Sequence, residues 1–145
     1  MKTAILYQST HHGNTKRLCD AIAAQYDVTL IDAAAPLPPL EPFDLIGIAS
    51  GIAFGKFYAP LLAKLEESLP EGKDVFFLFT AGSPKASYTD AVRAIAERKG
   101  CPYRGTWSCK GFDTYGPLKL IGGINRDRPN ADDLRGAVDF FSTLL

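Results

Sequence analysis

Three short stretches of the sequence combine small, hydroxylated and aromatic residues in a way that suits a bound ligand. They run over Ser9–Thr15, Ser50–Tyr58 and Thr80–Tyr88, and each directly follows or overlaps a run of apolar residues. The first reads Ser9-Thr10-His11-His12-Gly13-Asn14-Thr15 and precedes a helical pattern that starts at Lys16. Hydroxyl groups, a glycine that admits close backbone approach and the free N–H groups of a helix N-terminus together suit a phosphate group. We therefore expect the first stretch to bind the phosphate of a ligand.

The first stretch differs from the common nucleotide-binding loops. The sequence contains neither GxxxxGK[ST] nor GxGxxG, and no lysine is placed to reach the outer phosphates of a nucleotide. A monophosphate ester held by hydroxyl groups and backbone amides is the expected ligand group. The alternative is that these residues only cap the helix.

In the second stretch, glycines alternate with apolar and aromatic residues. A planar heteroaromatic ring gains from apolar and stacked contacts, while glycine backbone can approach its polar edge. Either Phe54 or Phe57 could stack on such a ring. Tyr58 is instead expected to begin the next helix, with Pro60 in its first turn. In the third stretch the best contacts are Thr80–Ser83, and Tyr88 could either touch the ligand or start a helix.

The first stretch resembles the phosphate loop of flavodoxins, which runs Ser/Thr-x-Thr-Gly-x-Thr between the first strand and the first helix. Gly13-Asn14-Thr15 carries the resemblance, and the departure is His12, where many relatives have threonine. The resemblance implies a flavodoxin-type protein that binds FMN and shuttles electrons between a reductase and acceptor proteins. It also implies these contacts with FMN: Ser9, Thr10, His11, His12, Gly13, Asn14, Thr15, Ser50, Gly51, Ile52, Ala53, Phe54, Gly55, Phe57, Thr80, Ala81, Gly82 and Ser83.

Other function classes stay open beside the electron carrier. An FMN-dependent oxidoreductase on the same fold, such as a quinone reductase or a protoporphyrinogen-oxidase-like enzyme, is the alternative, which a faint similarity over 50–62 supports. A flavin-free receiver domain would need acidic residues where the sequence has Gln8-Ser9 and Ala49-Ser50. Flavin chemistry requires no catalytic side chain, and His11-His12 lacks a third metal ligand, so neither a catalytic residue nor a metal site is expected.

The elements that must position these stretches follow from hydrophobic patterning. Continuous apolar runs predict buried parallel strands, and helical spacing of apolar residues lies between most of them. The strands are expected at Thr3–Gln8, Val28–Ile31, Leu45–Ala49 and Val75–Thr80, with a weaker fifth at Tyr103–Cys109. The clearest helix follows Asn130, its expected N-cap, with Asp133 three residues on. Only the connection through 36–42 lacks a helical pattern.

Strand and helix alternate, which predicts one α/β domain over residues 1–145. Its expected form is a flavodoxin-like, doubly wound sheet of five parallel strands, in the order 2-1-3-4-5, with helices on both faces. Ligands of such sheets bind beyond the carboxyl ends of the strands, where the strand order reverses. The three stretches follow the first, third and fourth strands, so they should meet there.

Composition and charge limit the class of protein and the cellular compartment that we expect. With 46% hydrophobic and 22% charged residues and a net charge of zero, the chain is an ordinary globular protein with no bias toward nucleic acid. No apolar run is long enough to cross a bilayer and no export signal is recognised, so a cytoplasmic protein is expected. The three cysteines, Cys19, Cys101 and Cys109, lack CxxC spacing and suit packing.

Positive charge gathers in one part of the chain. Between Arg93 and Arg128 there are eight Lys or Arg against three acidic residues. The segment over 110–128 is our candidate for the docking of redox partner proteins, and the alternative is a packed loop that covers the sheet edge. Lys56 and Lys85 adjoin the second and third stretches. Near a flavin they would favour its anionic reduced form, so we expect a milder reductant than acidic flavodoxins.

Overall fold

The computed structural model describes residues 1–10, 13–112 and 123–145. Within them, five parallel strands form the central sheet: β1 (Thr3–Gln8), β2 (Val28–Asp32), β3 (Leu45–Ala53), β5 (Asp74–Ala81) and β6 (Tyr103–Lys110). Their order is β2-β1-β3-β5-β6, which confirms the predicted 2-1-3-4-5 arrangement of parallel strands. A short additional strand, β4 (Lys56–Phe57), was not predicted and pairs antiparallel with the end of β3.

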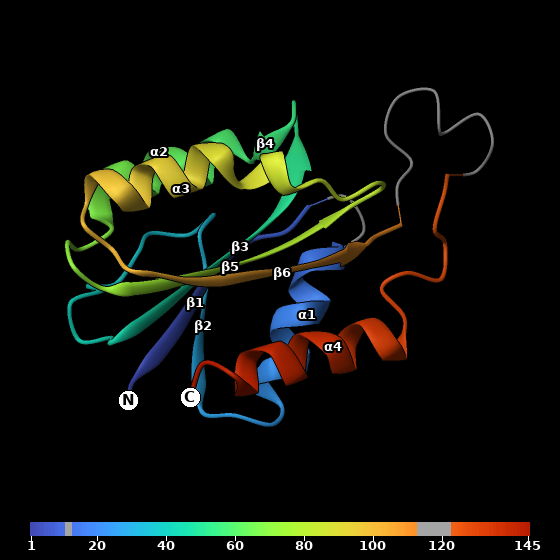
Figure 1. Ribbon diagram of the computed structural model, residues 1–145, viewed down its shortest axis with the longest axis horizontal. Helices are drawn as coiled ribbons and strands as arrows, with labels where there is room; N and C mark the ends of the chain where they lie inside the picture. The colour runs from blue at the N-terminus through green and yellow to red at the C-terminus, as the bar shows by residue number, and fades with distance from the viewer. Residues whose placement is uncertain (11–12, 113–122) are drawn as a thin grey trace.

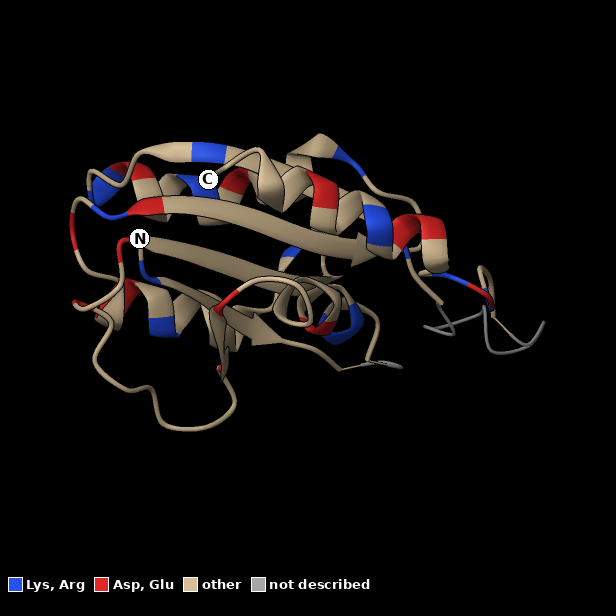
Figure 2. Ribbon diagram, turned by 90° about the horizontal axis from the view of Figure 1, so that it is seen from below, with Lys and Arg blue, Asp and Glu red and all other residues tan. Residues whose placement is uncertain are grey.

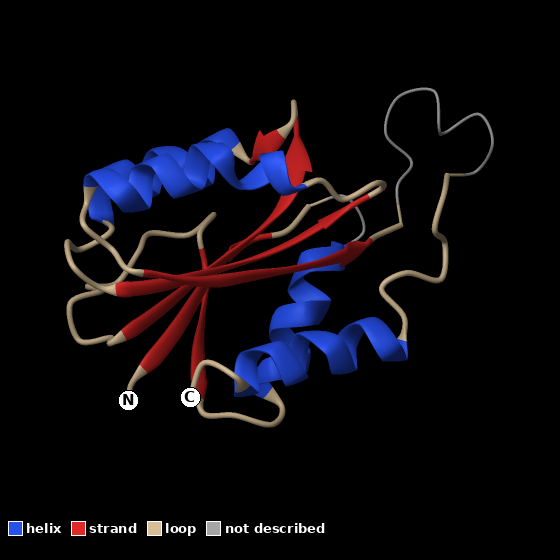
Figure 3. Ribbon diagram, in the orientation of Figure 1, coloured by secondary structure: helices blue, strands red, loops and turns tan. Residues whose placement is uncertain are grey.

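Helices cover both faces of the sheet (Figure 1). Helices α1 (Asn14–Ala23) and α4 (Ala131–Ser142) lie on one face; α2 (Ala59–Ser68) and α3 (Asp90–Arg98), with the 3-10 turn η2 (Ala86–Thr89) before α3, lie on the other. The connection through 36–42 contains no helix, as predicted (Figure 3). There Leu40, together with Phe43 just beyond it, is buried and fills the space against the sheet.

The strands are apolar because both faces of the sheet are covered. β1 and β3 contain no charged residue and β5 has only Asp74 at its first position, so the interior of the sheet is drawn almost entirely in tan in Figure 2. Alternate residues divide between two cores: Ile46 and Phe77 belong to one, and Phe76 belongs to the other. No helix in the described ranges is long and apolar enough to cross a bilayer.

Candidate functional site

A cavity of about 510 Å³ opens at the carboxyl ends of the strands, within the size range of small-molecule sites. The strand order reverses here, because the chain leaves β1 for α1 on one face and leaves the β3–β4 hairpin for α2 on the other. The residues that line it are Thr10, Asn14, Gly51, Ile52, Ala53, Phe54, Tyr58, Thr80, Ala81, Gly82, Ser83, Tyr88, Gly111 and Phe112.

The structure brings the three predicted stretches together around this cavity. From the first stretch, Thr10 and Asn14 reach the wall, and from the third, all of Thr80–Ser83 do. The second stretch contributes Gly51–Phe54. His11 and His12 lie outside the described residues. Ser9, Gly13, Thr15, Ser50, Gly55 and Phe57 are not on the wall.

Three of the hydroxyl groups that are not on the wall hold the loops in place. The Ser9 hydroxyl accepts a hydrogen bond from the Lys16 backbone N–H, with 3.0 Å between the atoms. The Thr15 and Thr80 hydroxyl groups bond to each other at 2.8 Å in the buried interior, which ties the first stretch to the third. The buried Ser50 hydroxyl donates to the Gly51 carbonyl at 2.6 Å and accepts from the Tyr58 N–H at 3.0 Å. These side chains shape the cavity from behind its wall.

The N-terminus of α1 lies beside the cavity. Gly13 is its N-cap, has the left-handed φ of 67° and makes no side-chain cap hydrogen bond, while the Ser9 hydroxyl accepts from the third N–H group of the helix, that of Lys16. A Cβ added at Gly13 would meet no described atom within 4 Å. The first N–H groups of a helix have no partner within the helix, and the helix dipole makes this end positive. Thr10 and Asn14, which line the cavity, lie beside this N-terminus, so an anionic group of a ligand in the cavity can reach these amides.

Phe54 and Phe57 have opposite surroundings. Phe54 and Gly55 form the two-residue turn between β3 and β4, with φ of 55° and 75°. The Phe54 side chain is 91% exposed and lines the cavity. Phe57 is fully buried and packs edge-on against Phe77 and Phe79, at ring-centre distances of 6.2 and 6.0 Å. Of the two aromatic residues left open by the sequence, Phe54 is therefore on the cavity wall and Phe57 is in the core.

The two tyrosines at the site also have distinct roles. Tyr58 stands at the start of the next helix, as expected, where it is the N-cap of α2, and it also lines the cavity. A Cβ at Gly51 would overlap the Tyr58 hydroxyl, so glycine is required where this ring lies against β3. Pro60 lies in the first turn of α2, as predicted. Tyr88 lies in η2, lines the cavity and packs edge-on against Phe79 at 6.1 Å.

Sequence reasoning missed a fourth wall, formed by Gly111 and Phe112 at the end of β6. Asn14 donates from its side-chain amide to the Phe112 carbonyl at 2.8 Å. The Phe112 N–H donates to the Arg128 carbonyl, and the Arg128 N–H donates to the Asn125 carbonyl, both at 2.9 Å. Contacts 14 to 98 residues apart in sequence build this wall, and no local pattern shows them.

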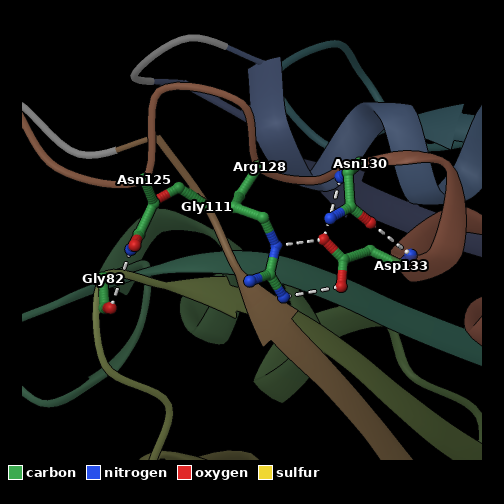
Figure 4. A network of polar contacts seen from close by, with 6 residues as sticks. All are labelled: Gly82, Gly111, Asn125, Arg128, Asn130 and Asp133. Atoms are coloured by element: carbon green, nitrogen blue, oxygen red, sulfur yellow. Dashed lines mark hydrogen bonds and ion pairs between the residues drawn. The ribbon is translucent and has the colours of Figure 1, made fainter.

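Asn125 and Arg128 anchor this wall from outside (Figure 4). The Asn125 side-chain amide donates to the Gly82 carbonyl at 3.0 Å and lies 3.4 Å from the Gly111 carbonyl. Arg128 pairs with Asp133 through two hydrogen bonds, of 2.5 Å from Nε and 2.7 Å from a terminal nitrogen. Asp133 in turn forms the predicted capping box of α4 with Asn130. The cavity wall is thus continuous with the cap of the last helix.

The charge state of Asp133 follows from these contacts. Burial alone would raise the pKa of this carboxyl, but hydrogen bonds from Arg128 and from the Asn130 backbone outweigh burial and hold the pKa below its ordinary value. The carboxylate therefore stays ionised and the anchor stays intact at neutral pH.

The described residues of the cavity wall carry no charge. They combine hydroxyl and amide groups with apolar and aromatic side chains, and none of them is Asp, Glu, Lys or Arg. The described part of the chain also holds no group of three or more potential metal ligands. Such wall residues suit a planar, largely apolar ring.

Comparison with known proteins places the chain in a family. No family model matches it. The uncharacterised protein MJ0298 of Methanocaldococcus jannaschii is 38% identical over 149 residues, spanning 100% of this chain and 99% of that protein. The chain belongs to the MJ0298 family. Because that relative is uncharacterised, this family membership brings no activity with it.

Solved structures show that this chain has the flavodoxin-like fold. Several of the matching structures are flavodoxins. The Fusobacterium nucleatum flavodoxin bound to flavin mononucleotide matches with a TM-score of 0.69 at 17% identity, over 99% of this chain and 97% of that one. An NADH:FMN oxidoreductase, EMOB, matches with a TM-score of 0.61 at 17% identity, over 100% of this chain and 90% of the other. The predicted flavodoxin-like fold is therefore confirmed.

Proposed function

We propose that the protein binds FMN in the cavity and carries electrons on it. One observation carries the proposal: a partly aromatic cavity, whose described wall residues are uncharged, adjoins the N-terminus of α1. A ligand with a phosphate at one end and a planar ring system at the other matches both parts of this site. FMN is bound by the Fusobacterium nucleatum flavodoxin that shares the fold, which agrees with the proposal.

The residues of the cavity fit such a ligand. Thr10, Asn14 and the backbone N–H groups that follow Gly13 would hold the phosphate. Phe54 and Tyr88 offer aromatic faces for the ring system. Backbone groups of Gly51 and Gly82, which lack side chains, would reach the polar edge of the ring. Of the eighteen predicted contacts, the ten on the wall are the primary candidates, and Tyr58, Tyr88, Gly111 and Phe112 join them.

When bound, FMN would supply the redox chemistry. The chain's own part is to bind the ligand, to orient it and to control its exposure to water. Phe54 and Ser83 are exposed residues of the wall, so the cavity opens to the surface at the β3–β4 turn and the loop after β5. Exchange of electrons between proteins needs such an opening. Redox partner proteins, their docking at 110–128 and the cytoplasmic setting stay predictions, and 113–122 lies outside the described ranges.

An FMN-dependent oxidoreductase is the second candidate, because an NADH:FMN oxidoreductase shares the fold. A direct substrate would need to enter the same cavity beside the ring. The neutral wall would then favour an uncharged acceptor such as a quinone.

The test is to titrate the purified protein with FMN and follow the quenching of flavin fluorescence, then to reduce the complex anaerobically with dithionite. Saturable binding of one FMN per chain, with reduction in two separate one-electron steps, is expected for the carrier. Reduction in one two-electron step, together with turnover of NADH and a quinone, would favour the oxidoreductase. Failure to bind FMN would refute both.

A further inference from the structure

Most cationic side chains in the described ranges have a partner within the molecule. Some form ion pairs with carboxylates, some bind backbone carbonyl groups, and two lie over aromatic rings. The partnered cations are Lys2, Lys16, Lys64, Lys73, Arg93, Arg98, Lys99, Arg104, Arg128 and Arg135. Arg17 lies close enough to Asp133 to lower the pKa of that carboxyl.

Four exposed cations differ, because the described residues offer them no such partner. They are Lys56, Lys85, Lys110 and Arg126. Lys56 pairs in register with Ala53, and Lys110 pairs in register with Ala81. Ala53 and Ala81 both line the cavity, which places Lys56 and Lys110 at its edge.

The other two unpaired cations adjoin the same opening. Lys85 follows Ser83 of the cavity wall by two residues. Arg126 follows Asn125, whose amide holds the Gly82 carbonyl. All four unpaired cations thus adjoin the cavity wall, and we define the cavity mouth as Lys56, Lys85, Lys110 and Arg126 together with the exposed wall residue Phe54.

Few unpaired acids offset these charges at the mouth end of the molecule. Asp20 is paired with Lys16, and Asp32 accepts a hydrogen bond from the Ala34 N–H. Among the described residues, Asp32, whose partner is an uncharged N–H group, Asp90 and Asp127 remain there as exposed acids without a cationic partner. Four cations therefore face three acids.

Exposed acids gather instead at the opposite edge of the sheet. Glu67, Glu71 and Glu97 lie in the last turn of α2, just beyond it, and in the last turn of α3. The helices run antiparallel to the strands, so their C-terminal ends lie away from the cavity (Figure 1).

We propose that the cavity mouth is the docking surface for an acidic redox protein. The inference rests on the proposed function, because a redox partner has reason to dock where the flavin would be reached. Unpaired cations around an uncharged opening attract an acidic surface and orient it, since complementary charge raises association rates more than it raises affinity. Phe54, 91% exposed on the cavity wall, supplies the apolar contact of the interface.

The experiment measures binding of an oxidised, acidic plant-type [2Fe–2S] ferredoxin by isothermal titration calorimetry at low ionic strength. It uses the wild-type protein, the double variant Lys56→Glu/Lys85→Glu and the matched control Lys2→Glu/Lys73→Glu. Both double variants change the net charge by the same amount, but Lys2 and Lys73 precede β1 and β5 at the opposite edge of the sheet. Basic cytochrome c and double-stranded DNA are measured as comparison partners, and stopped-flow mixing tests whether reduced ferredoxin passes electrons to bound FMN.

We expect Lys56→Glu/Lys85→Glu to bind ferredoxin about tenfold more weakly than wild type. The affinity of the control variant, Lys2→Glu/Lys73→Glu, should stay within about twofold of wild type. Physiological salt should weaken wild-type binding, because the Debye length falls to about 8 Å. Equal effects of the two variants, or cytochrome c or DNA binding as tightly as ferredoxin, would overturn the proposal. The calorimetry needs no flavin, so the two proposals are tested separately. Binding of ferredoxin at the mouth without binding of FMN would support the docking surface and refute the proposed function.

Discussion

The side-chain amide of Asn125 holds the backbone carbonyl of Gly82 across 43 residues of sequence, with 3.0 Å between nitrogen and oxygen. The same amide lies 3.4 Å from the Gly111 carbonyl. One side chain therefore connects the loops that follow β5 and β6, and both loops contribute to the cavity wall. The Asn125 backbone has a φ of 57°, a region that asparagine tolerates better than most residues.

Two substitutions at Asn125 distinguish the role of its side-chain amide from the role of its left-handed backbone conformation. Asn125→Gly keeps the left-handed backbone accessible but removes the amide, and Asn125→Ala loses both. We expect Asn125→Gly to weaken FMN binding about tenfold, which corresponds to the loss of one to two hydrogen bonds of about 1 kcal/mol each. Asn125→Ala should in addition lower the free energy of unfolding by about 1 kcal/mol. Fluorescence titration and urea unfolding check the two effects, and equal affinity of Asn125→Gly and wild type would contradict a positioning role.

Phe54 should lower the stability of the apoprotein and strengthen the binding of the ligand. Its φ of 55° is unfavourable for an aromatic residue, whereas Asn-Gly is the preferred pair for a two-residue hairpin turn. We expect Phe54→Asn to raise the free energy of unfolding of the apoprotein by about 1 kcal/mol. The same variant should weaken FMN binding by about 1 kcal/mol through loss of an aromatic contact. Urea unfolding and FMN titration on one preparation test the opposite signs; a variant that loses stability would show that the turn is not strained.

The Arg128–Asp133 pair predicts an acid-sensitive anchor. The folded-state pKa of Asp133 lies below its unfolded value, so the carboxylate contributes stability above the unfolded pKa of about 4. That contribution is lost as the pH falls through the folded-state pKa. Asp133→Asn should cost about 1–2 kcal/mol at pH 7, because it breaks the ion pair and the capping box together. Urea unfolding as a function of pH tests this, and the difference between variant and wild type should shrink in acid.

Lys56 and Lys85, beside the cavity, should raise the reduction potential of bound FMN. Lys56→Glu or Lys85→Glu places a negative charge where a positive one stood, which disfavours the anionic reduced form of bound FMN. We expect the potential of the second one-electron reduction to fall by tens of millivolts at low salt, the order of magnitude of a Coulomb interaction near a protein surface. Spectroelectrochemistry measures the potential, with Lys73→Glu as the distant control. A potential unchanged by both variants at low salt would refute the predicted influence of these lysines.

Two cysteines should be inert in the native protein. Burial, with Asp20 nearby, raises the pKa of Cys19 to about 12, and burial, with Asp133 nearby, raises the pKa of Cys109 to about 12. The thiolate is the reactive form, so neither thiol should react with Ellman's reagent at pH 8 until the protein unfolds. The absorbance of the product released from Ellman's reagent, measured with and without urea, gives the number of thiols that react in the folded and the unfolded protein. Cys19→Ser and Cys109→Ser assign any thiol that reacts early.

The fold could be predicted because its signals are local. Unbroken apolar runs showed the buried strands, and the capping box at Asn130 and Asp133 showed the last helix. The first and third stretches could be placed at the cavity for the same reason, since each directly follows or overlaps the end of a strand. The exception was β4, whose two residues form no pattern of their own and depend on the tight turn at Phe54 and Gly55.

The parts that could not be predicted depend on distant contacts. Whether Phe54 or Phe57 lies on the cavity wall is decided by the turn at Phe54 and Gly55, after which Phe57 is buried against the ring of Phe77. The wall at Gly111 and Phe112 depends on Asn14, 98 residues away from Phe112. Asparagine at 125 looks unremarkable in sequence, and only its left-handed backbone and two distant carbonyl groups reveal its role.

The reversal of strand order between β1 and β3 has a consequence for how this family can diversify. The hollow exists because the chain departs from two neighbouring strands toward opposite faces, so it is a product of connectivity and not of any one side chain. Substitutions along its wall can change which molecule fits without erasing the hollow itself. A relative with substitutions at Phe54, Tyr58 or Tyr88 would keep a cavity at the carboxyl ends of the strands, and that cavity could bind a different ligand.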